Sequence, residues 1–245
     1  MAMTSTAAEA SSSIYKFDYM DGYGSSPSTF SSIQSWMFRR APGFFDVVAY
    51  TGDSQTVREV SHNLNAVPEL IIAKSRSGSS DWTVYSSFTG PSKYLQLQTT
   101  NEAVTNSLFW KDITPTDTVF TVGNTFSTNK SGYTHIAYLF ATVSGISKVG
   151  SYTGTGANLD VDCGFTSGAR FVLVKRADST GDWYLWDSAR GIVAGNDPYL
   201  FLNTSAAQVT STDYIDPLSS GFTVTSSAPA ALNTSGGTYL FLAIA

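Results

Sequence analysis

The feature that most limits how this chain can fold is an internal repeat. Tyr50-Thr51-Gly52 returns as Tyr152-Thr153-Gly154, at an offset of 102 residues. Further matches follow in the same order, with offsets from 101 to 105 residues: Asp81-Trp82 with Asp182-Trp183, Tyr94-Leu95 with Tyr199-Leu200, Phe120-Thr121-Val122 with Phe222-Thr223-Val224, and Asn129 with Asn233. Ordered matches at a single period indicate a structural unit that occurs more than once.

A third, partial copy precedes these two. Ser5-Thr6-Ala7-Ala8-Glu9 resembles residues 204–208, and Trp36-Met37-Phe38 resembles Tyr138-Leu139-Phe140. We therefore predict a half repeat in residues 1–43, a first unit in residues 44–145 and a second unit in residues 146–245.

The half repeat raises a question of completeness, because a β-sandwich without its first strands exposes unpaired backbone groups. Three explanations remain open: the half repeat pairs with another chain, it completes a sheet of the neighbouring unit, or Met1 is not the natural start. Of these, we expect that another subunit supplies the missing strands.

Apolar residues recur with a period of two, as in strands. Residues 159–165 alternate between large apolar side chains and Asp or Gly, which indicates a strand with one wet face. Residues 70–73 and 171–174 are apolar on both faces, as in a central strand that is covered on both sides. The pattern predicts an all-β fold of tandem antiparallel β-sandwich repeats, of jelly-roll or lectin-like type.

Turn residues place the strands of the first unit near 45–50, 56–62, 69–74, 82–86, 94–97, 119–122 and 134–142. Residues 76–80 and 178–181 are expected at hairpin tips, because they are rich in Gly, Ser and Asp. Residues 99–105 and 205–211 could each form a short turn of helix.

Composition narrows the functional classes. Only 13% of residues are charged and the net charge is −5, which argues against binding nucleic acid. The first 13 residues are small and polar, so we expect no signal peptide, and no apolar run suggests insertion into a membrane. Cys163 is the single cysteine, which excludes an intrachain disulfide and a cysteine-based zinc site.

Signals for enzyme chemistry are poor. His62 lies on an alternating strand, and His135 takes the place of Tyr239 in the other unit, so both are interpreted as packing residues. Asp160 and Asp162 share one face of a strand, which favours a solvated surface over a Ca²⁺ site. We therefore expect no catalytic residue, no metal site and no cofactor.

Aromatic residues give a better indication of a binding site. Trp82 and Trp183 occupy matching positions and are expected in the core, which points the neighbouring Trp186 away from it. The longest loop of the second unit follows, and the candidate ligand-binding residues are Trp186, Asp187, Arg190, Asn196, Asp197 and Tyr199. These side chains suit either a sugar or receptor site or, as we favour, packing against a neighbouring subunit.

Residues 36–52, WMFRRAPGFFDVVAYTG, resemble the junction of a family of tailed-phage virion proteins. Val60-Ser61-His62-Asn63-Leu64, Gly181-Asp182-Trp183-Tyr184 and Asp187-Ser188-Ala189-Arg190-Gly191 resemble the same family, whose members often carry a concanavalin A-like lectin domain ahead of such repeats.

The resemblance implies a non-enzymatic virion structural protein of the tail fibre or tail tip that contributes to attachment to host-surface glycans. Other virion proteins are the implied partners, and a homo-oligomer, with three copies as our guess, is the implied state. A head-associated fibre or capsid decoration protein is the first alternative, and a polysaccharide depolymerase is the second.

Overall fold

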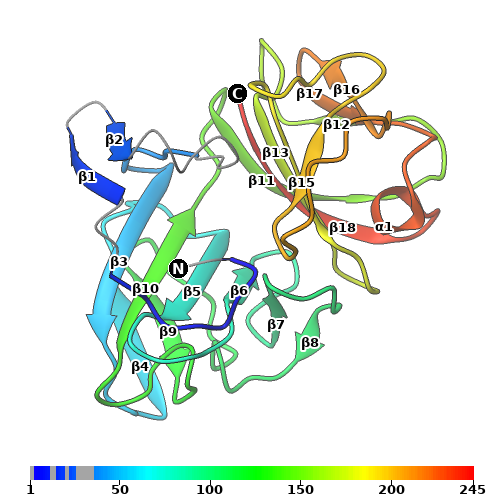
Figure 1. Ribbon diagram of the computed structural model, residues 1–245. Coiled ribbons are helices and arrows are strands. Elements are labelled where there is room, and N and C mark those ends of the chain that lie inside the picture. Colours follow the sequence, from blue (N-terminus) through cyan, green and yellow to red (C-terminus); the bar gives the residue numbers. More distant parts are fainter. Residues whose placement is uncertain (1–2, 12–14, 20–21, 26–35) are drawn as a thin grey trace.

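Antiparallel β-sheets form two lobes in the computed structural model, which describes residues 3–11, 15–19, 22–25 and 36–245. Figure 1 shows the first unit from blue to green and the second unit from green to red. The rest of the predicted half repeat, residues 1–2, 12–14, 20–21 and 26–35, lies outside the described residues. The all-β antiparallel sandwich prediction is confirmed, whereas its finer jelly-roll and lectin-like labels stay predictions.

The first unit has one large sheet and one small sheet. The large sheet has the order β3-β10-β5-β6-β7-β8, with bounds Phe45–Thr51, Thr134–Phe140, Leu70–Ser75, Thr83–Ser86, Lys93–Gln96 and Val104–Thr105. The small sheet pairs β4 (Val57–Ser61) with β9 (Val119–Gly123). The seven strands expected from the sequence are all present, and only the short β8 was missed.

The second unit has the same strand order. Its large sheet is β11-β18-β13-β14-β15, with bounds Ser147–Thr153, Thr238–Ile244, Phe171–Arg176, Trp183–Asp187 and Tyr199–Phe201. Its small sheet is β12-β17-β16, with bounds Leu159–Asp162, Gly221–Val224 and Ile215–Leu218, and a short helix α1 spans Ala230–Asn233. The predicted boundaries at residues 43/44 and 145/146 fall between strands and remain predictions.

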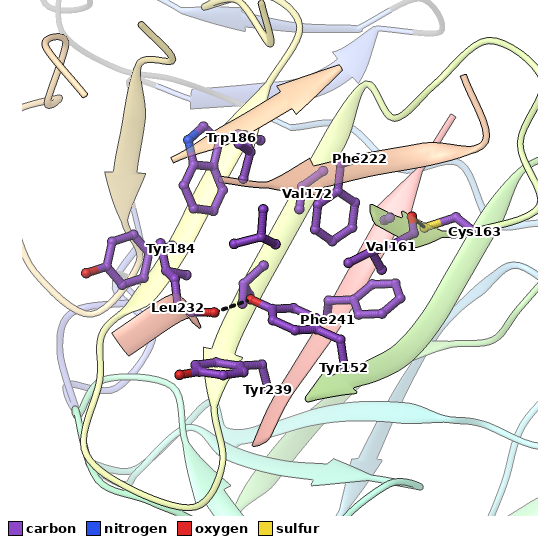
Figure 2. Packing of buried hydrophobic residues seen from close by; sticks show 14 of the residues in the cluster. Tyr152, Val161, Cys163, Val172, Tyr184, Trp186, Phe222, Leu232, Tyr239 and Phe241 are labelled. Atoms are coloured by element: carbon purple, nitrogen blue, oxygen red, sulfur yellow. Dashed lines mark hydrogen bonds between the residues drawn. The ribbon is translucent and has the colours of Figure 1, made fainter. Parts of the chain in front are cut away.

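The central strands of both large sheets are buried on both faces, which explains why these strands have no polar face. Ile71 and Val172 point inward to the small sheet of their own unit, whereas Leu70 and Leu173 point to a third apolar cluster between the units. Alternate residues of one strand therefore enter two different cores. The prediction that residues 70–73 and 171–174 form covered central strands is confirmed. Figure 2 shows the inner core of the second unit.

Strands β1 (Tyr15–Tyr19) and β2 (Gly22–Ser25) pair with each other in a sheet of two strands. In the described residues this sheet joins neither unit, so the alternative in which these strands complete a neighbouring sheet is not observed. The predicted helical turns at residues 99–105 and 205–211 are wrong. The amide of Ala103 donates to Ala177 O, and Val104–Thr105 is strand β8, because tertiary partners capture the backbone of the first segment.

Candidate functional site

The predicted binding loop is mostly interior. Trp186 is 0% exposed, and its ring lies 5.7 Å from that of Tyr184 and 5.6 Å from that of Tyr199. Figure 2 shows Trp186 and Tyr184 in one cluster with Val172 and Phe222. Trp183 was correctly expected in a core, but Trp186 does not face solvent, because the sheet that carries both residues is covered on both sides.

Asp187 and Arg190 contact Trp36, which belongs to the predicted half repeat. The Trp36 indole N–H donates to Asp187 Oδ2 over 2.8 Å, and the Arg190 guanidinium carbon lies 5.4 Å from the centre of the Trp36 ring. Arg190 also forms an ion pair with Asp187, and both side chains are nearly buried. Burial lowers the pKa of Arg190, while Asp187 acts against that shift. These residues therefore serve a contact within the chain.

The remaining candidates divide between interior and surface. Asp197 is buried and accepts hydrogen bonds from the amides of Val193 (3.2 Å) and Ile215 (3.1 Å). Burial raises the pKa of its carboxyl to about 6. Tyr199 belongs to the inner core, and Asn196 is the one candidate with an exposed side chain. A ligand at the surface would therefore meet Asn196 and little else of the predicted set.

The other polar residues singled out from the sequence have packing or surface roles. His62 and His135 are buried, and His135 stacks on Tyr50 with ring centres 5.3 Å apart. Asp160 and Asp162 are exposed on β12, and Asp160 accepts a hydrogen bond from the Thr223 hydroxyl. Within the described ranges, no three His, Cys, Asp or Glu side chains gather to hold a metal ion.

An apolar groove of about 460 Å³ lies between the two units. Its lining residues are Met3, Trp36, Met37, Phe38, Phe45, Val47, Ile72, Trp82, Leu97, Tyr138, Phe140, Phe171, Leu173, Leu185, Leu202 and Leu242. Both large sheets and two separate parts of the half repeat contribute to this lining. We call this site the inter-unit groove.

Phe38 is the centre of contact in the inter-unit groove. Its ring lies 5.5 Å from Phe45, 5.6 Å from Phe140 and 5.6 Å from Phe171, so it touches both units. This role of Phe38 was not predicted from the sequence, although the match of Trp36-Met37-Phe38 to a core strand was a usable signal. The groove has no acid–base pair in its lining, and its apolar surface suits packing against another polypeptide.

A second hollow is polar and lies on the first unit. It has a volume of about 380 Å³ and is lined by Thr6, Ser79, Ser80, Asp81, Phe109, Thr125, Phe126 and Ser127. Phe126 is 43% exposed and its ring lies 4.8 Å from that of Tyr133. Hydroxyls and a carboxylate beside an exposed aromatic face form a combination that suits a sugar. We call this site the polar hollow.

The fold and these two sites define an all-β protein of packed antiparallel sandwiches. The chain belongs to the family described as Domain of unknown function (DUF7483), whose model matches residues 2–245. A search of curated proteins and a search of solved structures each returned no match. No helix in the part of the chain that the structure describes has the length and apolar character needed to cross a membrane.

Proposed function

We propose that the protein is a non-enzymatic structural protein of a virion, located in the tail fibre or tail tip. The observation that carries this proposal is the inter-unit groove, because its apolar lining suits the packing of one β unit against another. The resemblance of residues 36–52 to tailed-phage virion proteins supplies the setting. Other virion proteins are the proposed partners, and a homo-oligomer of three copies is the proposed state.

Attachment to host-surface glycans is the second part of the proposal, and the polar hollow supports it. An exposed aromatic ring stacks on the apolar face of a sugar, while hydroxyls and a carboxylate bond to its hydroxyl groups. The Phe126→Ala variant removes the ring and is expected to weaken binding to host cells. Phe88→Ala is the matched control, because Phe88 is 47% exposed and lies outside the hollow.

Antibody labelling of intact particles under the electron microscope tests the location. Label at the tail end would support the proposal, and label spread over the head would replace it with a head fibre or decoration protein. Particles that carry no label, although the antibody recognises the purified chain, would refute a virion role. The mass of the purified chain by light scattering tests the oligomeric state.

A further inference from the structure

The hairpin between β5 and β6 is covered by an arm from the half repeat. Thr6 O accepts a hydrogen bond from the buried Lys74 ammonium (3.0 Å) and from the Ser80 amide (2.8 Å). Further along the arm, the Glu9 amide donates to Arg76 O over 2.6 Å. The Lys74 ammonium also donates to Ser80 O over 2.7 Å, so the arm supplies a second acceptor to a buried charge that is costly to leave with few partners.

The equivalent hairpin of the second unit, between β13 and β14, is covered in the same way by the first unit. Thr100 O accepts hydrogen bonds from the buried Lys175 ammonium (3.1 Å) and from the Gly181 amide (2.9 Å). The Ala103 amide donates to Ala177 O over 2.9 Å. Thr100 therefore repeats the role of Thr6, at an offset of 94 residues.

The contact between successive units is head-to-tail, because the arm of one unit covers the hairpin of the next unit along the chain. In a two-fold arrangement of the units, the arm of the second unit would return to cover Lys74, but Thr6 occupies that place. Head-to-tail contacts of this kind generate either a closed ring or an open helix. A closed ring is favoured, because the half repeat also touches the second unit through the Trp36–Asp187 hydrogen bond.

The arm of the second unit, residues 204–208, covers no hairpin among the residues that the structure describes. Asn203 binds the Trp183 amide and Asp182, as Gln98 binds the Trp82 amide and Asp81, so the two arms begin in the same register. Beyond that point residues 205–208 are exposed. The Gln208 amide, which corresponds to that of Ala103, donates to no acceptor among the described residues.

The lining of the inter-unit groove also contains equivalent residues from the half repeat, the first unit and the second unit. Met3, Leu97 and Leu202 occupy the same position in the three arms, and all three line the groove. Phe38, Phe140 and Leu242 are likewise equivalent and share it. Phe38 nevertheless lies in no strand, because the described residues provide no β3- or β5-like neighbours for it.

We propose that the inter-unit groove and the arm of residues 204–208 together bind a third sandwich half, a partner polypeptide with the strand pattern of residues 44–97. The partner's hairpin would place its buried lysine on Ser205 O, and its strands would flank residues 36–38. The ring would then contain three equivalent units. The existing interface between the two units continues into the groove, which supports a partner of the same fold.

This inference deepens the proposed function by naming the partner's structure, but it rests on the geometry of the arms and of the groove, and not on the virion role. Particle labelling decides the virion role, whereas the partner is tested on the purified chain. The proposed virion role and the proposed partner can therefore be refuted independently.

A fusion supplies the partner directly. A second copy of residues 44–97 is joined ahead of Thr4 of the full chain, so that its Leu97 takes the position of Met3. Hydrogen exchange by NMR then follows the Gln208 amide, which is expected to slow by about tenfold or more when it bonds to the added hairpin. The Ala103 amide, already bonded in the parent chain, is the internal reference and should not change.

The matched control is the same fusion with Lys74→Met in the added copy, in which exchange at Gln208 should remain near the parent rate. A second fusion uses residues 146–202 as the added half, since the two halves are equivalent. The proposal is overturned if both fusions leave Gln208 at the parent rate, or if neither added half folds onto the chain.

Discussion

Phe38→Ala should loosen the contact between the half repeat and both units. The ring of Phe38 makes three aromatic contacts with centres within 5.6 Å, to Phe45, Phe140 and Phe171. A fully buried Phe→Ala change costs about 3 to 5 kcal/mol, and Phe38 is half-buried, so we expect a loss of about 2 to 3 kcal/mol in the free energy of unfolding.

Guanidinium unfolding followed by tryptophan fluorescence measures this loss. Arg39→Ala is the control, because the adjacent Arg39 is exposed and outside the groove lining, so it should change the free energy of unfolding by no more than about 0.5 kcal/mol. Equal midpoints for the two variants would refute the reasoning, since Phe38 would then add nothing to the joint between the units.

Three further variants probe buried residues. Trp186→Ala should cost about 3 to 5 kcal/mol by thermal denaturation, whereas exposed Asn196→Ala should leave the melting temperature unchanged; a harmless Trp186 change would contradict its burial. Burial lowers the pKa of Lys175 from 10.5 to about 8, so the unfolded chain binds more protons between these values. Lys175 should therefore contribute a rise in stability with pH there, and Lys175→Met should remove that contribution in denaturant titrations. The pKa of Asp197 is raised from 3.8 to about 6, so the folded chain holds the extra proton and stability should fall as pH rises through this window; Asp197→Asn should flatten the curve, and an unaltered curve would exclude this carboxyl as its source.

Much of the fold was predictable from local pattern. Alternation, turn residues and doubly apolar runs located the strands of the first unit, because a strand's side-chain period and the chemistry of its turns are local properties. The hairpin tips at residues 76–80 and 178–181 were predicted for the same reason, and they lie between β5 and β6 and between β13 and β14.

The candidate site was less predictable. Trp186 alternates with Trp183, and alternation tells which residues share a face but not what covers that face. Here both faces are covered, so Trp186 enters the inner core and Trp183 the cluster between the units. Asp187, at the end of β14, and Arg190, in the loop that follows, were interpreted as facing a sugar or another subunit, whereas their partner is Trp36 of the same chain.

The sequence by itself determined the repeat, the strand content and the similarity of residues 5–9 to residues 204–208, since the first and last come from direct comparison of segments and strand content follows local side-chain pattern. Only the tertiary structure decided that Thr6 and Thr100 cover equivalent lysines, while residues 204–208 cover no hairpin in the described part of the chain. The physical reason is that these contacts join residues 68 and 75 positions apart, where packing of whole sheets, and not local preference, sets which groups meet.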